Sequence, residues 1–329
     1  MASGQLDSAT ATPAERLRAW QEGMIEQLEA LGLADRIMTT PPSSGEVVRG
    51  GRFFAAEYLR DAIESAGASL HGRLAVQPKS DEEREVKLTA AASRFTRYYM
   101  SSLTFAAFVG LARGVGLDLA PHRCTKVFMH GLPGGYLLGD PGEGVVTCAE
   151  RAAAWPIDGQ TVATIGELRA HVWKQLYGEN FAPLIALTKE TTRATGNLLW
   201  SNAAEMVAFV ADQAVALLDP TEAAPFVEDA DALLNADVVP GIAGPNPMRG
   251  LIEWVPVDEP DFPRGVQLRP HCCITYVLPV RTGLLCGNCP FLPLEDRIAL
   301  TRERLNGGRG GPAELKSIEI GRRKLRTAD

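Results

Sequence analysis

Four of the six cysteines in this sequence fall within 18 positions, at Cys272, Cys273, Cys286 and Cys289. They form an adjacent pair followed by a Cys-x-x-Cys turn. Six cysteines in 329 residues are too few for a disulfide scaffold, and a tight cysteine group in a reducing compartment more often binds a metal or takes part in catalysis. This group places the strongest constraint on how the chain can fold.

The turn Cys286-Gly287-Asn288-Cys289 can supply half of a four-sulfur metal site, because the two sulfurs of such a turn can face one point. Gly287 removes a side-chain obstacle, and Asn288 tolerates left-handed backbone. The amides of the turn can then donate hydrogen bonds to the sulfurs.

The adjacent pair Cys272-Cys273 is the unusual half of the group. Neighbouring residues on a regular strand point to opposite faces, so a shared centre requires an irregular backbone, and Pro270 favours one. A single metal ion would have to draw both sulfurs together, whereas a two-iron cluster offers them separate corners. The pattern therefore favours a [2Fe–2S] cluster.

Two other interpretations of the cysteines stay open. One is a structural zinc site, although zinc sites usually pair two Cys-x-x-Cys units. The other is a set of free or disulfide-forming thiols. His271 could replace a thiolate, but we leave it out of the ligand set, because a histidine beside a cysteine pair is more often a neighbour of the site. Cys124 and Cys148 are expected to be small buried hydrophobes.

Composition limits the partners. The sequence has 46% hydrophobic and 22% charged residues, a formal net charge of −7 and a pI of about 5.4, so no basic field would attract nucleic acid. Residues 1–11 lack the apolar core of a signal peptide, and no stretch approaches the roughly 18 to 20 apolar residues of a spanning helix. We expect no transmembrane segment and a cytoplasmic location, with a peripheral position at the inner membrane face as the alternative.

Helical periodicity covers most of the chain. Thr12-Pro13-Ala14-Glu15 predicts an N-cap with a capping box, and Gly32 predicts the end of that helix. An acidic first turn at Asp81 begins a long helix. The expected helices cover residues 12–32, 53–65, 81–111, 165–177, 181–192, 198–218 and 292–305.

Two regions predict strands. Residues 126–129 and 135–138 flank Gly131-Leu132-Pro133-Gly134, which predicts a hairpin or a small sheet. Residues 266–280 alternate as a strand does. The expected fold class is α+β, predominantly helical, with a small C-terminal cysteine-rich iron-sulfur subdomain.

Prolines and glycines concentrated between residues 240 and 263 predict a domain boundary. The expected parts are a flexible N-terminal tail, a mainly helical domain, a [2Fe–2S] subdomain and a flexible basic tail, which cover residues 1–11, 12–238, 239–305 and 306–329.

Arg269-Pro270-His271-Cys272-Cys273, followed by Cys286-Gly287-Asn288-Cys289-Pro290, resembles the C-terminal signature of the FhuF-type ferric siderophore reductases. Leu199-Trp200-Ser201-Asn202-Ala203 resembles a recurrent segment of the same family. The resemblance covers roughly residues 53–293. The connection from Ile274 to Leu285 is slightly longer than the family form.

The resemblance implies a cytoplasmic oxidoreductase that passes one electron from a [2Fe–2S] cluster to the iron of a ferric hydroxamate siderophore, and so releases it. Cys272, Cys273, Cys286 and Cys289 would carry the cluster, and residues 12–238 would bind the siderophore. Such a reaction needs no catalytic acid, base or nucleophile, since Fe(III) is held by hard oxygen ligands and Fe(II) much less tightly.

No glycine-rich segment of the sequence matches a dinucleotide or phosphate loop. We therefore expect another protein, a ferredoxin or a flavin-dependent reductase, to supply the electron.

Aromatic and hydrogen-bond-donating side chains in the matched regions are candidate siderophore contacts, because such groups suit hydroxamate chelates. Each also has a structural interpretation, as a core residue for the tryptophans and as a solvated or sulfur-bonding group for the arginines. The candidates are Trp200, Asn202, Arg249, Trp254 and Arg269.

Two functions of other classes compete with the reductase. One is a zinc-stabilised binding or scaffold protein, in which the metal only holds the C-terminal strands together. The other is a siderophore-synthetase-like enzyme, which the four cysteines and the missing nucleotide loop argue against.

Overall fold

The structure is a computed structural model that describes residues 12–43, 45–71, 80–139, 144–151, 160–258, 262, 264–278 and 288–306. Its α-helices are α1 (Pro13–Ala30), α2 (Ala56–His71), α3 (Asp81–Ala112), α4 (Ile165–Trp173), α5 (Ala182–Thr191), α6 (Gly196–Leu217), α7 (Pro220–Asn235) and α8 (Leu294–Asn306). Short helical turns lie at η1 (Ala34–Arg36), η2 (Gly50–Phe54) and η5 (Thr275–Val277), and a π-helix at η4 (Lys174–Phe181).

The strands are short and form small sheets. One sheet has the order β1-β5-β4-β2, a second β3-β6-β7 and a third β8-β9. Their bounds are β1 (Ile37–Met38), β2 (Val47–Arg49), β3 (Val115–Gly116), β4 (Thr125–Met129), β5 (Leu132–Leu137), β6 (Val146–Cys148), β7 (Gln160–Val162), β8 (Glu253–Val255) and β9 (Val266–Leu268). The predicted α+β class with predominant helix is confirmed.

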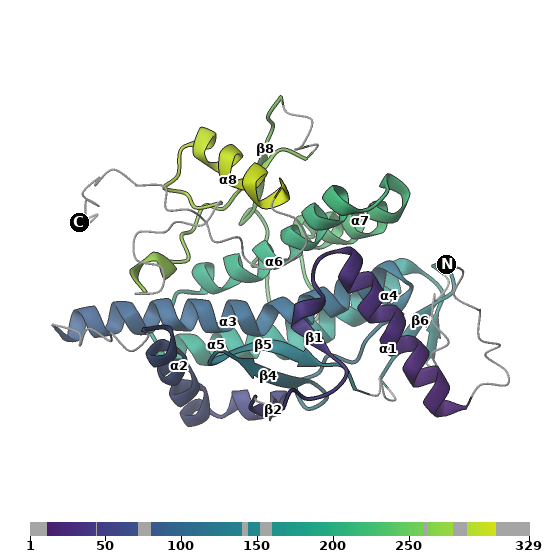
Figure 1. The fold of residues 1–329 in the computed structure, drawn as a ribbon, viewed down its shortest axis with the longest axis horizontal. Coiled ribbons are helices and arrows are strands. Elements are labelled where there is room, and N and C mark those ends of the chain that lie inside the picture. The colour runs from purple at the N-terminus through teal and green to yellow at the C-terminus, as the bar shows by residue number, and fades with distance from the viewer. Residues whose placement is uncertain are drawn as a thin grey trace.

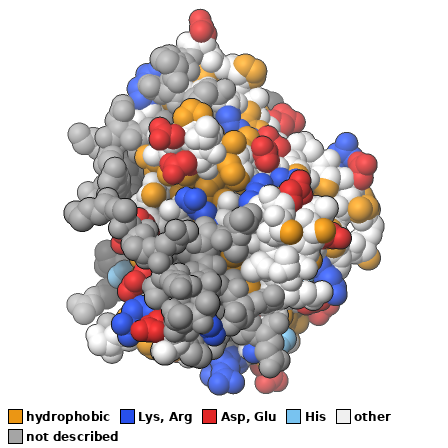
Figure 2. Space-filling model, turned by 90° about the vertical axis from the view of Figure 1, so that its right-hand side faces the viewer, with side chains coloured by type: hydrophobic (Ala, Val, Ile, Leu, Met, Phe, Trp, Pro, Cys, Tyr) orange, Lys and Arg blue, Asp and Glu red, His pale blue; other side chains and the backbone are white. Residues whose placement is uncertain are grey.

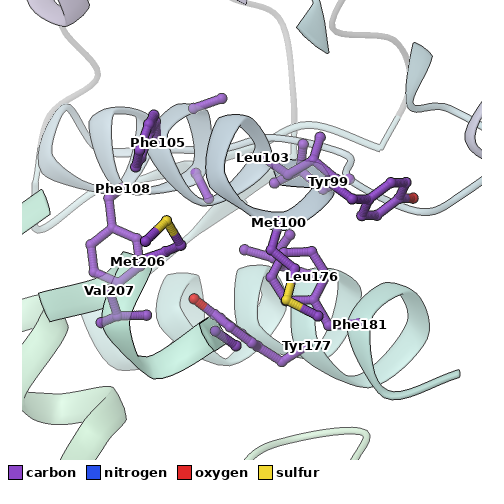
Figure 3. Close-up of a cluster of buried hydrophobic side chains, with 14 of the residues drawn as sticks. Tyr99, Met100, Leu103, Phe105, Phe108, Leu176, Tyr177, Phe181, Met206 and Val207 are labelled. Carbon is purple, nitrogen blue, oxygen red and sulfur yellow. The ribbon is translucent and has the colours of Figure 1, made fainter. Parts of the chain in front are cut away.

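The helix α3 organises the fold (Figure 1): it crosses the middle of the molecule, with the sheet of β4 and β5 on one side and α6 and α7 on the other. In Figure 3, Phe108 of α3 points toward Met206 and Val207 of α6, while Met100 lies against Leu176 of η4. All five side chains are buried in the main hydrophobic core. Removing such apolar area from water is the main stabilising contribution to folding.

Local sequence signals fix the ends of the first helices. Thr12 accepts a hydrogen bond from the Glu15 amide, and Glu15 bonds back to the Thr12 amide, so the predicted capping box is confirmed. Gly32, just beyond α1, has a φ of 66°, which favours glycine. Ser80 caps α3, because its side chain accepts a hydrogen bond from the Glu83 amide.

The hairpin is confirmed, but its predicted turn was displaced. His130 and Gly131 form the turn, with φ of 53° and 77°, and Pro133 and Gly134 belong to β5. Two consecutive positive φ values match the turn type that continues the right-handed twist of a two-stranded ribbon. A proline in a strand usually signals a loop, which explains why the sequence pattern pointed to the wrong residues.

The helices expected over residues 165–177 and 181–192 are continuous through the π-helix η4. Gly178, in this π-helix, faces the loop after α7 so closely that a Cβ there would lie 2.7 Å from the Gly241 Cα. Gly241 has a φ of 83°. This backbone contact needs glycine on both sides, and it holds the start of the segment that leads to the cysteines.

The helix α7, which is absent from the expected helices, begins at Pro220. Proline suits the first turn of a helix, because the missing N–H has no partner there. The strand expected over residues 266–280 is limited to β9, after which the backbone is irregular and forms η5. The expected last helix is confirmed as α8.

Charges are mixed on the molecular surface. Figure 2 shows acidic and basic side chains interspersed over the described part of one face, with a hydrophobic patch in its upper part. Among the helices of the described residues, none combines the length and apolar character that crossing a bilayer requires. The predicted flexible tails, 1–11 and most of 306–329, lie outside the described residues.

A buried lysine lies between α3 and the hairpin. Lys126 of β4 is fully buried, and its ammonium donates to the Tyr99 carbonyl oxygen at 2.9 Å and to the Ser102 hydroxyl. Burial lowers the pKa of this lysine to about 7. The folded protein therefore holds a neutral Lys126 at pH values where the unfolded chain holds a charged one.

We expect the free energy of unfolding of the wild-type protein to rise by about 1 kcal/mol per pH unit between pH 7 and 8.5, because the unfolded lysine keeps its proton up to its ordinary pKa of 10.5. The variant Lys126→Met should lack this rise. Above pH 9 the Cys124 thiol, whose pKa burial raises to about 12, contributes the opposite slope. Urea unfolding at pH values both below 8.5 and above 9 measures the two slopes. Lys189→Met, at an exposed position, is the control. An unchanged slope in Lys126→Met would contradict the prediction.

Candidate metal centre

Three of the four clustered cysteines lie in the described part of the chain. Cys272 and Cys273 follow β9, and Cys289 lies five residues before α8. Cys273 and Cys289 are buried, and Cys272 is half-buried. Cys286, the fourth predicted ligand, lies outside the described residues.

The three thiols interact with one another. Hydrogen bonds with Cys273 and then with Cys289 raise the pKa of the Cys272 thiol. The hydrogen bond with Cys272 is also the largest cause that lowers the pKa of Cys289. One sulfur thus keeps its proton while its neighbour accepts a hydrogen bond, as expected where sulfurs are crowded together.

The backbone around the cysteine pair is irregular, as the pair requires. Ile274 has a φ of 50°, which is unfavourable for a β-branched residue. Its amide donates to the Cys272 sulfur at 3.3 Å, and the Cys273 sulfur lies 3.1 Å from the Thr275 hydroxyl oxygen. The left-handed residue turns the chain after the pair, and the Cys272 sulfur reaches both Cys273 and Cys289.

A buried arginine anchors this segment. Arg269 is 1% exposed. Its Nε donates to the His271 carbonyl oxygen at 3.0 Å, one Nη donates to Asn202 Oδ1 at 2.9 Å, and the other forms an ion pair with Glu205. Asn202 in turn donates to the Ser93 carbonyl oxygen at 3.0 Å. Arg269, three positions before the cysteine pair, is therefore bonded to α6 directly and to α3 through Asn202.

Glu205 of α6 is the centre of the network. One carboxylate oxygen pairs with Arg269, while the other accepts from Arg97 at 2.7 Å and from the Asn288 side chain at 3.0 Å. Asn288 also donates to the Gln267 side-chain oxygen at 2.9 Å. Because Asn288 directly precedes Cys289, the same carboxylate holds both halves of the cysteine group.

A further cation lies beside Cys289. Arg297 of α8 is buried, and its Nε donates to the Leu292 carbonyl oxygen at 2.9 Å. Its charge contributes to the lowered pKa of Cys289, as does the hydrogen bond from the Phe291 amide. Close to the cysteines in the chain, the rings of Tyr276 and Phe291 meet edge to face with centroids 6.5 Å apart, and Phe291 is 54% exposed.

The predicted siderophore contacts divide into two sets. Asn202 and Arg269 are hydrogen-bonded to each other next to the cysteine segment, and Trp200 is buried on α6, the helix that also carries Asn202. Trp254 donates to Asp212 at 3.0 Å and stacks with an arginine, and Arg249 forms an exposed ion pair with Asp237. These are their contacts within the protein, and a role in siderophore binding stays a prediction for all five.

Sequence reasoning missed Glu205, Arg97 and Arg297. Glu205 did carry a signal, because it is a lone acidic residue in the buried part of an apolar helix, and such a carboxylate needs a cationic partner. No local pattern identifies Arg97, which is 108 positions away from the glutamate.

Among the described residues, no group of three or more histidine, cysteine, aspartate and glutamate side chains stands ready to hold a metal ion. The donor set nevertheless suits an iron-sulfur cluster, which is anionic and is held by thiolates. The Cys272 thiol is hydrogen-bonded to Cys273 and to Cys289, amides donate to the sulfurs of Cys272 and Cys289, and Arg297 adds positive charge. A surface cavity of about 440 Å³ lies elsewhere, on α1, and contains none of the predicted site residues.

The fold and the site define a predominantly helical α+β protein with a crowded cysteine group at its C-terminal end. The family described as "Ferric iron reductase FhuF-like transporter" matches residues 93–253, so the chain carries an FhuF-like domain and the resemblance seen in the sequence is confirmed. The match includes Ser93, Arg97, Asn202 and Glu205 and ends before the cysteines.

No curated protein matches the chain. Among solved structures, aerobactin synthetase IucC from a hypervirulent pathotype of Klebsiella pneumoniae is similar at 11% identity and a TM-score of 0.45. The similarity covers 63% of this chain and 37% of that one.

Proposed function

We propose that this protein is a ferric siderophore reductase that transfers one electron to the bound Fe(III) and so releases the iron. The observation that carries the proposal is the hydrogen bonding of Cys272 with both Cys273 and Cys289, in a segment that Glu205 joins to the FhuF-like domain. A bound [2Fe–2S] cluster, held by these three cysteines and Cys286, would supply a one-electron donor of tunable potential.

The protein's own residues would exclude water and leave one side of the centre open. Cys273 and Cys289 are buried, whereas Cys272 is half-buried. Phe291, more than half exposed, lies two residues beyond Cys289. A ferric siderophore or an electron-donating protein would approach the centre from this side.

The reaction would need no bond in the siderophore to be broken. Its hard oxygen donors hold Fe(III) tightly and Fe(II) weakly, so the gain of one electron is enough for release. We propose a hydroxamate siderophore as substrate, a ferredoxin or flavin-dependent reductase as electron donor, and the cytoplasm as the location.

The experiment begins with anaerobic purification and metal analysis. We expect red-brown protein with about two irons and two sulfides per chain. After reduction with dithionite, it should be reoxidised by a ferric hydroxamate siderophore while a ferrous-specific chelator develops colour. NADPH alone should not replace dithionite, whereas NADPH with a ferredoxin and its reductase should sustain turnover.

Each failure has a distinct meaning. Colourless protein with one tightly bound zinc would exclude the reductase and favour the zinc-stabilised scaffold. An intact cluster that no siderophore reoxidises would identify a general electron carrier. Steady reduction by NADPH and the purified chain alone would reveal a nucleotide or flavin site in this protein.

A further inference from the structure

One buried hydrogen-bond donor close to the cysteine group lacks an acceptor. The side-chain nitrogen of Gln267, in β9, is shielded from solvent and has no hydrogen-bond partner among the described residues. Buried polar groups are nearly always paired, because a donor that gives up its bonds to water without a replacement is costly. This nitrogen therefore indicates an acceptor other than the described side chains and backbone.

The orientation of the Gln267 amide is fixed by Asn288. Gln267 Oε1 accepts from the Asn288 side-chain nitrogen at 2.9 Å, and the same nitrogen donates to Glu205 Oε1 at 3.0 Å. Turning the Gln267 amide by half a rotation would set two nitrogen donors against each other. The Gln267 nitrogen therefore stays available to a different acceptor.

Gln267 is joined to the anchors of both halves of the cysteine group. Asn288, its partner, directly precedes one of the cysteines. Arg269 lies two positions after Gln267, the spacing at which side chains of a strand share one face, and it bonds to the residue before the cysteine pair. Glu205 bonds to both Arg269 and Asn288. One set of hydrogen bonds thus holds the Gln267 amide and both cysteine segments together.

The described cysteine sulfurs already have donors of their own. Cys272 and Cys289 each accept a hydrogen bond from a backbone amide, and the Cys273 sulfur lies 3.1 Å from the Thr275 hydroxyl oxygen. A bound [2Fe–2S] cluster would bring sulfide acceptors that the polypeptide lacks. An unpaired amide donor next to the group is what such an acceptor requires.

We propose that the Gln267 side-chain amide, held in its orientation by Asn288, donates a hydrogen bond to a sulfur of the bound [2Fe–2S] cluster and raises the reduction potential. The assignment rests on the proposed function, because it requires the cluster. Reduction adds negative charge to the cluster, and an N–H donor stabilises that charge. Gln267 therefore sets how strongly the centre reduces Fe(III).

The first measurement detects the hydrogen bond directly. Protein is made by cell-free synthesis with glutamine that carries ¹⁵N in its side chain, and the reduced, paramagnetic cluster is studied by pulsed electron paramagnetic resonance. We expect a ¹⁵N coupling in the wild-type protein, because a hydrogen bond to sulfur transfers unpaired spin density to the donor nitrogen. The coupling should vanish in Gln267→Glu, which keeps an oxygen for Asn288 but has no side-chain nitrogen.

The second measurement is the midpoint potential by anaerobic redox titration. At a fixed electrode potential, we expect the ratio of reduced to oxidised protein to fall about three- to tenfold in Gln267→Met, which keeps a side chain of similar length but removes the donor. A tenfold change equals about 59 mV for a one-electron couple. Gln267→Glu should lower the ratio at least as much, because it places a carboxylate where the donor was.

Two substitutions elsewhere are matched controls. Gln175 of η4 is also partly buried, and its side-chain oxygen accepts from the Leu119 amide at 3.2 Å. Asn246 is 5% exposed, and its side-chain nitrogen donates to two carbonyl oxygens. Gln175→Met and Asn246→Ala should keep the wild-type coupling and potential. Asn288→Ala, which releases the Gln267 amide, should weaken the coupling.

A cluster without ¹⁵N coupling in the wild-type protein, or a coupling that persists in Gln267→Glu, would overturn the donor assignment. Equal potentials in Gln267→Met and Gln175→Met would overturn it as well. These failures require a bound cluster, so they leave the proposed function intact. If the wild-type protein binds no cluster, the proposed function fails and the donor assignment fails with it. If the coupling is present but no siderophore is reduced, the donor assignment stands and only the proposed substrate is lost.

Discussion

Cys289→Ser is expected to abolish most of the visible absorption and bound iron of the purified protein, from about two irons per chain to near background. The Cys289 sulfur is hydrogen-bonded to Cys272 and accepts a hydrogen bond from the Phe291 amide. The charge of Arg297 favours its thiolate form. A serine oxygen is a harder ligand on a shorter bond, so it is a poor replacement for this sulfur in a cluster. Iron and sulfide analysis with visible circular dichroism measures the loss.

Cys286→Ser should have the same effect, because Cys286 is the predicted fourth ligand. Cys148→Ser and Cys124→Ser are the controls, since both cysteines are fully buried in the main core. The controls should keep the spectrum even if they lower stability. Loss of colour in Cys148→Ser together with an unchanged spectrum in Cys272→Ser would disprove the ligand assignment.

Features decided by local sequence were predictable. The caps of α1 and α3 depend on residues within three positions, and both helices begin where the sequence indicated. The hairpin was predictable from two β-rich segments separated by glycines, although its turn lies at His130 and Gly131, earlier in the chain than the segment between them indicated. The helix α7 was not among the expected helices, because Pro225 lies inside it and proline in a helix interior usually argues against a helix.

Features decided by distant contacts were not predictable. Residues 266–280 alternate as a strand, but the buried bond from Arg269 to the His271 carbonyl oxygen and the left-handed Ile274 end that strand after three residues. The cysteines themselves were evident as candidate ligands. Glu205 was not, because its role depends on partners that lie 64 and 108 positions away.

The network also changes how two sequence candidates are understood. Asn202 and Arg269 were selected as siderophore contacts, yet they bond to each other at 2.9 Å and lie behind the cysteines. We infer that their main effect on function is to hold the cysteine segment. Arg249, selected on the same grounds, lies in an exposed ion pair and offers a direct comparison.

Arg269→Ala is expected to lower the free energy of unfolding by about 3 to 5 kcal/mol. The substitution leaves Glu205 buried with Arg97 as its remaining cationic partner and removes the donor from Asn202 Oδ1 and from the His271 carbonyl oxygen. It also opens a cavity where a large side chain was fully buried. Guanidinium unfolding followed by circular dichroism and tryptophan fluorescence measures the change.

Arg249→Ala is the matched control, because it removes an arginine from an ion pair with 59% and 84% exposed side chains. Such pairs contribute little in water, so its effect should stay within about 0.5 kcal/mol. A fluorescence transition at lower denaturant than the circular dichroism transition in Arg269→Ala would show that the cysteine segment detaches before the helices unfold. Equal effects of the two substitutions would mean that Arg269 does not anchor this segment.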